Sequence, residues 1–267
     1  MRRNDRTKRI AGGFRGGFTL VEMLVVVVII GILAGLVTAV AMRVRVAARV
    51  AEIKLELSSI EQALALFKEK YGDYPPDCTN EQEVARFIAA TWPRYTGDWK
   101  TAIGWASLQN DPAAALVFWL GGMRNGTELL GFSPNPRNPF ETATTGGRQP
   151  LFDFRPDRLR IVSGKLYYFQ PNATNDTEPY VYFKSGASGY YLPGTTTVKN
   201  WNQCKACYDL RVGPNAWAAP NKFQLRAPGL DGKHGEGVGF PNGTDYNEFQ
   251  YDDVANFSDG TFEDAIP

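Results

Sequence analysis

The amino-acid sequence predicts an α+β protein, in which a long N-terminal helix packs on a small C-terminal antiparallel sheet with a large mixed insertion. Two observations support this prediction. One apolar segment of helical length is followed by a heptad-like apolar repeat. Short β-rich segments, bounded by Gly, Pro or Asn, gather in the second half of the 267-residue chain. A helix that covers one face of an antiparallel sheet is an α+β arrangement.

The first segment, residues 1–17, is strongly basic. It carries six Lys and Arg residues and one acid, and it ends in Gly16-Gly17. Without it, the 29 basic and 28 acidic residues of the chain fall to 23 and 27, a net charge of −4. Binding to nucleic acid needs clustered Lys and Arg that displace counterions. We therefore expect no nucleic-acid partner.

The second segment, residues 18–42, is a 25-residue run in which Glu22 is the only ionisable side chain. About 20 apolar residues cross a bilayer as a helix, and the basic flank is expected on the cytoplasmic side. A secretory signal peptide is the alternative, but its apolar part is usually about 7 to 15 residues long. A carboxylate in a membrane is costly unless it is compensated, so Glu22 either has a partner or snorkels to the headgroups.

The run Gly17-Phe18-Thr19-Leu20-Val21-Glu22 resembles the processing site of the type IV prepilin and pseudopilin family. The resemblance implies that a prepilin peptidase cleaves between Gly17 and Phe18, that Phe18 is N-methylated, and that 250 of the 267 residues remain. It also implies a homo-oligomeric helical filament in which Glu22 neutralises the Phe18 amine of a neighbouring subunit. Buried opposite charges of this kind set the register between subunits.

Residues 43–72 continue the helix as an amphipathic segment. Apolar residues recur at alternating intervals of four and three, at Val46, Val50, Ile53, Leu57, Ile60, Leu64 and Phe67. This seam suits a free coiled coil or docking onto a following domain, and we favour docking. Gly72 and Pro75-Pro76 end the helix. The exit Tyr71-Gly72-Asp73-Tyr74-Pro75 resembles that of the major, G-type pseudopilins of type II secretion systems.

The globular domain is expected over residues 73–267. Helices are predicted at 81–91 and 112–123, a polar loop at 133–150, and strands at 159–169, 180–184 and 222–227. The scattered tryptophans are predicted to be core residues rather than a ligand platform. Residues 77–150 resemble an insertion relative to the G-type pseudopilins.

The C-terminal loop is glycine-rich and acidic, with Asp231 followed by several carboxylates that include Asp252 and Asp253. Carboxylate oxygens suit calcium, although the spacing does not match an EF-hand. The resemblance to G-type pseudopilins implies a structural calcium ion bound by Asp231 and Asp253, with Asp252 as the alternative to Asp253.

Cys204 and Cys207 form a C-x-x-C. A disulfide, half of a zinc site and a redox pair all agree with this spacing. We favour a disulfide because the segment is expected outside the cytoplasm, and Cys78 could instead pair with either residue.

No enzyme is predicted, since the chain has one histidine, His234, and no G-x-S-x-G, phosphate-loop or H-E-x-x-H motif. The resemblance implies a pseudopilin of a type II secretion system, with a single pass through the inner membrane and a periplasmic globular domain. Its filament would drive protein export with minor pseudopilins and a secretion platform. The alternatives are a type IV pilin for adhesion, motility or DNA uptake, and a membrane-anchored adhesin or receptor domain.

Overall fold

The computed structural model describes residues 17–143 and 147–267. The leader predicted for residues 1–17 therefore lies outside the described residues except for Gly17. The chain divides into two units, Met1–Val46 and Ala47–Pro267, and the boundary falls within helix α1 (Leu20–Tyr71). In the first unit, α1 has exposed side chains throughout its described part.

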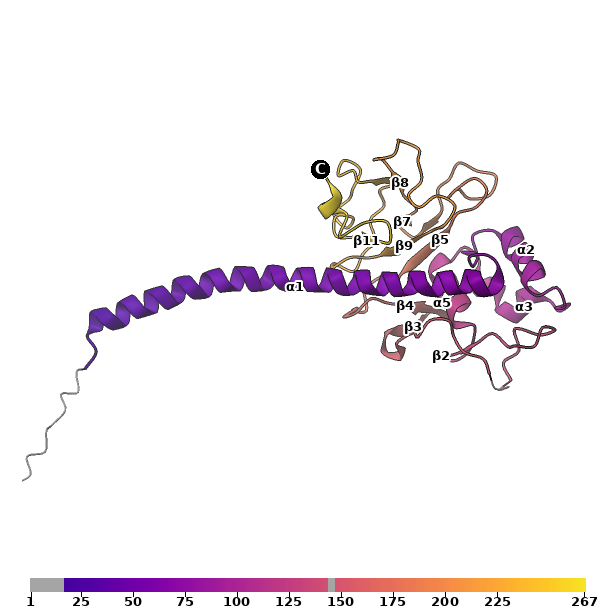
Figure 1. Ribbon diagram of the computed structural model, residues 1–267, viewed down its shortest axis with the longest axis horizontal. Coiled ribbons are helices and arrows are strands. Elements are labelled where there is room, and N and C mark those ends of the chain that lie inside the picture. Colours follow the sequence, from indigo (N-terminus) through magenta and orange to yellow (C-terminus); the bar gives the residue numbers. More distant parts are fainter. Residues whose placement is uncertain (1–16, 144–146) are drawn as a thin grey trace, which may run out of the picture. The chain divides into compact units, whose positions relative to one another are not determined.

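The second unit contains the remaining elements, many of which are labelled in Figure 1. The helices are α2 (Glu81–Thr91), α3 (Trp99–Ile103), α4 (Trp105–Leu108) and α5 (Pro112–Gly121), with 3-10 turns η1 (Pro156–Arg158) and η2 (Glu263–Ala265). The strands are β1 (Met123–Asn125), β2 (Glu128–Gly131), β3 (Leu159–Val162), β4 (Lys165–Tyr168), β5 (Val181–Lys184), β6 (Asn200–Trp201), β7 (Cys204–Lys205), β8 (Tyr208–Asp209), β9 (Phe223–Ala227), β10 (Gly239–Phe240) and β11 (Val254–Ala255). The predicted α+β class is confirmed.

The second half of α1 buries one face in the core of this unit. Five residues of the predicted seam are at most 3% exposed: Ile53, Leu57, Ile60, Leu64 and Phe67. The opposite face is open, and Leu55 is 71% exposed. The docking prediction is confirmed for this part of the seam, whereas Val46 at its start is exposed.

Helix α5 is buried on nearly all sides, as expected for a helix that is apolar all round. Asp111 caps its N-terminus by accepting a hydrogen bond from the backbone N–H of Ala114 at 3.1 Å. The helix ends at Gly121, earlier than the predicted residue 123. Gly122 has φ +73°, and a Cβ there would lie 2.2 Å from the backbone of Gly131, so only glycine fits this close approach.

The main sheet is antiparallel and has the strand order β11-β9-β5. The central strand β9 is buried at all five positions, and Arg226 within it pairs with Val181 of β5 and Ala255 of β11. Strands β5 and β9 lie within predicted strands. Strand β11 lies in a segment predicted to be loop, because two residues are too short to show an alternating pattern.

Residues 159–169, predicted as strand throughout, form the hairpin β3–β4. Ser163 and Gly164 at its turn have φ +50° and +80°. Positive φ at both central residues is the signature of a type I′ turn, which reverses the chain in two residues. The hairpin lies beside β5, since the backbone N–H of Tyr180 donates to the carbonyl oxygen of Tyr168 at 3.0 Å.

Glu56 connects α1 to this part of the domain. Its carboxylate accepts hydrogen bonds from the hydroxyl of Tyr168 at 2.8 Å and the hydroxyl of Tyr180 at 2.5 Å, and it forms an ion pair with Arg158. Burial raises the pKa of both tyrosines above the ordinary range, and the nearby Glu56 adds to the rise.

Three of the tryptophans predicted to be core residues are buried, at Trp92, Trp105 and Trp119. The indole of Trp119 lies against the rings of Phe67 on α1 and Phe87 on α2, with centroid distances of 6.2 and 5.3 Å. Trp119 therefore packs the inserted region against α1.

Candidate filament-assembly site

Helix α1 begins with a reciprocal pair of hydrogen bonds between Thr19 and Glu22. The hydroxyl of Thr19 accepts from the backbone N–H of Glu22 at 3.2 Å, and the Glu22 carboxylate accepts from the backbone N–H of Thr19 at 2.8 Å. The Thr19 hydroxyl also donates to this carboxylate at 2.9 Å. This arrangement is a capping box, which satisfies backbone donors that a helix start leaves unpaired.

The sequence signal for this cap is a Thr followed three residues later by Glu before an apolar run. Glu22 is a predicted site residue because of its charge, whereas Thr19 is not among the predicted site residues. Both carboxylate bonds end on Oε2 of Glu22. Within residues 17–143 and 147–267, no hydrogen bond reaches Oε1, so this oxygen is open to a further partner.

The apolar residues that follow Glu22 are exposed. An 18-residue window of α1 has a mean hydropathy of 3.0, and none of it is buried inside the molecule. By length and composition, α1 is the one helix among the described residues that could cross a membrane. So large an exposed apolar surface requires lipid or other helices around it.

The predicted cleavage site lies immediately before this helix. Gly17 and Phe18 precede the helix start, and the side chain of Phe18 is 78% exposed. Cleavage between them would place a new amino group one residue from Thr19 and four residues from Glu22. The structure therefore brings Thr19 and Glu22 together at one end of an apolar rod.

These features define a prepilin-type N-terminal segment, with a capped glutamate at the start of an exposed apolar helix. The prokaryotic N-terminal methylation motif matches residues 14–38. The match indicates a type IV pilin-like or pseudopilin subunit, and this motif implies processing by a prepilin peptidase and assembly into a filament. Searches among curated proteins and among solved structures found no match.

The three candidate calcium ligands have different surroundings. Asp231 accepts from the backbone N–H of Lys233 at 2.7 Å, and Oδ2 of Asp252 accepts from the backbone N–H groups of Leu230 and Asp231 at 2.5 and 2.8 Å. Burial raises the pKa of Asp231 to about 6, and the charge of Asp252 adds to the rise. Asp252 thus organises the turn at residues 230–231.

Asp253 is 0% exposed and contacts a cation of the protein itself. Its Oδ2 lies 2.5 Å from Nη2 of Arg226 and also accepts from the backbone N–H of Gly235 at 3.0 Å. Oδ1 of Asp253 and Oδ1 of Asp252 are buried without a hydrogen-bond partner. The ring Nδ1 of His234 lies 3.8 Å from Oδ1 of Asp253.

These residues do not fit a calcium ion in this arrangement. Calcium takes six to eight oxygen ligands, and the described residues contain no group of three or more His, Cys, Asp or Glu side chains that could hold a metal. A guanidinium already lies against Asp253. Calcium binding by Asp231, Asp252 and Asp253 stays a prediction that this geometry does not support.

The cysteines Cys78, Cys204 and Cys207 are free and buried. The predicted disulfide between Cys204 and Cys207 is not formed in this structure. Burial raises the pKa of the Cys207 thiol to about 11, so the thiol stays protonated near neutral pH. A buried thiol with a raised pKa is unreactive.

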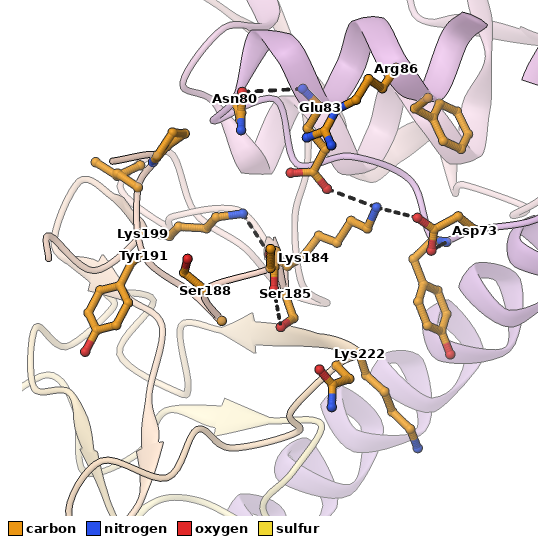
Figure 2. A pocket seen from close by; sticks show the side chains of 18 of the residues that line it. Asp73, Asn80, Glu83, Arg86, Lys184, Ser185, Ser188, Tyr191, Lys199 and Lys222 are labelled. Atoms are coloured by element: carbon orange, nitrogen blue, oxygen red, sulfur yellow. Dashed lines mark hydrogen bonds and ion pairs between the residues drawn. The ribbon is translucent and has the colours of Figure 1, made fainter. Parts of the chain in front are cut away.

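A cavity of about 780 Å³ lies beside the C-terminal end of α1, next to α2 and the loop after β5. Figure 2 shows Lys184 between two acids, with Nζ 2.7 Å from Asp73 and 3.0 Å from Glu83. Lys199 Nζ binds the buried Asp77 at 2.7 Å. These ion pairs hold the chain that leaves α1 against β5, and we assign the cavity no ligand.

Proposed function

We propose that this chain is a filament-forming pseudopilin subunit of a type II secretion system. The observation that carries the proposal is the capped Glu22 at the start of an exposed apolar helix, directly after the Gly17–Phe18 bond. In a simple membrane anchor, the charge of a glutamate in this position would cost free energy. A positive charge on a neighbouring helix would compensate that cost.

In this proposal a prepilin peptidase removes residues 1–17 on the cytoplasmic side of the inner membrane, and the new amine of Phe18 is methylated. The subunit waits as a single-pass protein with its globular domain in the periplasm. Pairing of Glu22 with the Phe18 amine of a neighbour then sets the axial register as subunits enter a helical filament. Growth of the periplasmic filament, with minor pseudopilins and the secretion platform, pushes exported proteins across the outer membrane.

The segment after α1 supports a pseudopilin over a type IV pilin. Its sequence resembles the helix exit of G-type pseudopilins, and the ring of Tyr74 lies between the ammonium of Lys68 and the ring of Phe223, at 4.5 and 4.9 Å. The hydroxyl of Tyr182 donates to the carbonyl oxygen of Pro75 at 2.8 Å. These contacts therefore fix the segment after α1 against the main sheet.

The first experiment tests processing. Incubating the full-length chain with a prepilin peptidase should reduce its mass by residues 1–17, and a methyl donor should then add one methyl group to Phe18. Cleavage at another bond, or no cleavage by a peptidase that processes a control prepilin, would refute membership in this class of filament subunits.

The second experiment separates the candidate systems. Deleting the gene in its native host should leave exported enzymes in the periplasm while surface fibres, motility and DNA uptake stay unchanged. Loss of fibres with normal export would establish the type IV pilin instead. Loss of attachment alone, with the protein remaining monomeric in the membrane, would establish an anchored adhesin or receptor.

A further inference from the structure

The C-terminal segment that follows β9 returns to the main sheet and is held by two basic side chains, one from the sheet and one from α1. It contributes β11 to the edge of β9, next to the acidic residues 252–253. Arg226 reaches it from within the sheet, and Lys54 reaches it from α1. All of these residues belong to the second unit.

The guanidinium of Arg226 connects three parts of the chain. Besides Asp253, it donates to the carbonyl oxygen of Lys205 at 2.9 Å and lies 2.8 Å from the sulfur of Cys207. Its Cζ lies 4.6 Å from the centre of the Phe262 ring. Arg226 is 0% exposed, and these contacts replace hydration at its two Nη atoms, whereas its buried Nε has no hydrogen-bond partner among the described residues.

Phe262 and Asp253 are also joined directly. The backbone N–H of Phe262 donates to the carbonyl oxygen of Asp253 at 2.9 Å. The guanidinium therefore lies in a closed site whose walls are a carboxylate, a carbonyl oxygen, a thiol and an aromatic face. The carboxylate and carbonyl are oxygen ligands of the kind that calcium prefers. Here they contact the guanidinium of Arg226, a cation that belongs to the chain itself.

Lys54 acts in a similar way on the turn after β11. Its ammonium donates to the carbonyl oxygen of Ala255 at 2.9 Å and to the carbonyl oxygen of Ser258. The side chain of Asn256, within the same turn, donates to Glu61 of α1 at 2.8 Å and accepts from the backbone N–H of Leu225 at 2.9 Å. The turn is thus held from both α1 and β9.

We propose that the side-chain charges of Arg226 and Lys54 stabilise the C-terminal segment in place of a metal ion. The segment then folds and stays ordered without calcium or another divalent ion. Oδ2 of Asp253 is paired with Arg226 from inside the sheet, whereas its Oδ1 has no hydrogen-bond partner among the described residues. A divalent ion placed against Asp253 would lie within a few ångströms of the Arg226 guanidinium, and like charges at that distance repel strongly in a buried site. This inference is independent of the choice between secretion and pilus systems.

The experiment measures thermal unfolding of the full chain in detergent micelles, in EGTA, in millimolar CaCl₂ and in millimolar MgCl₂. The three midpoints should agree. If the chain had a calcium site, a free calcium concentration of 100 times its dissociation constant would raise the midpoint by roughly 5 to 11 °C. A rise of that size in CaCl₂ or in MgCl₂ overturns the proposal.

Variants test the cation directly. Arg226→Met should lower the midpoint by roughly 6 to 20 °C, because Asp253 is left buried without its partner. The matched control is Arg86→Met on α2, an exposed arginine, which should shift the midpoint by at most about 2 °C. Equal midpoints for Arg226→Met and Arg86→Met refute the role of Arg226.

Asp253→Asn provides a second readout. The fall in the unfolding midpoint of this variant should be the same in EGTA and in CaCl₂. If Asp253 were a calcium ligand, the midpoint would fall only in CaCl₂. Where Arg226→Met does not fold, the comparison of the unmodified chain in EGTA and CaCl₂ decides the question alone.

Discussion

Removing the charge of Glu22 should abolish filament assembly and leave membrane insertion intact. At a separation of about 4 Å and an effective dielectric constant of about 20, a carboxylate and an amine attract by about 4 kcal/mol. Loss of this term weakens each subunit contact by about a thousandfold. The apolar helix that is long enough to cross a membrane keeps all its other residues, so insertion should be unaffected.

Because Glu22 both carries a charge and caps the helix, two variants are needed to test these roles separately. Glu22→Gln retains an amide oxygen that can accept from Thr19 but has no charge. Thr19→Ala keeps the charge and loses the hydroxyl that makes two of the three bonds, at a cost of about 1 kcal/mol. Charge pairing therefore predicts nearly normal filaments for Thr19→Ala, and none for Glu22→Gln and Glu22→Ala.

The assay is the amount of sheared or sedimented filament at matched levels of membrane-inserted subunit. Normal filament yield from Glu22→Gln would refute the charge-pairing account. A defect in Thr19→Ala as severe as that in Glu22→Ala would assign the role of Glu22 to capping of the helix.

Three further predictions concern the globular domain. Glu56→Leu should lower the free energy of unfolding by about 3–5 kcal/mol in urea titrations, because Arg158 loses its buried partner; an unchanged denaturation midpoint would contradict this. Leu57→Ala should cost about 2–5 kcal/mol, since Leu57 is 1% exposed, whereas Leu55→Ala at 71% exposure should change stability by at most about 0.5 kcal/mol; similar losses for both would mean that this helix is not docked as described. Burial lowers the pKa of His234 from 6.5 to about 3, so His234 binds more protons in the unfolded chain between these values, and its contribution to stability should fall by up to about 1.4 kcal/mol per pH unit as the pH drops through this window. The raised pKa of Asp231 acts in the opposite direction. His234→Gln should flatten that dependence, and a stability profile as steep as that of the unmodified chain would exclude His234 as its source.

The elements predicted well from sequence are those with strong local signals. Helix α2 has the predicted bounds of 81 and 91, because Asn80 is a good N-cap and the residues after it have helical spacing. The hairpin β3–β4 was missed because Ser163-Gly164 is a weak turn signal within a continuous run of strand formers.

The two candidate sites also differ in how strong their local sequence signals are. The capping box at Thr19 and Glu22 spans three residues and is readable from the sequence. The partner of Asp253 was not readable, because Arg226 lies 27 residues earlier and looks like one polar position in a strand. Resemblance implied a calcium ligand at Asp253, and the structure places an arginine there.

Local patterns in the sequence are enough to predict the anchor: a basic leader, an apolar helix with Glu22 near its start, and an exit at Gly72 and the prolines. How the C-terminal segment is held follows from tertiary packing, since Lys54 and Ala255 are 201 residues apart in the chain. Local signals depend on neighbouring residues, whereas the partner of a buried charge depends on which segments pack together, and no short-range pattern in the sequence records that choice.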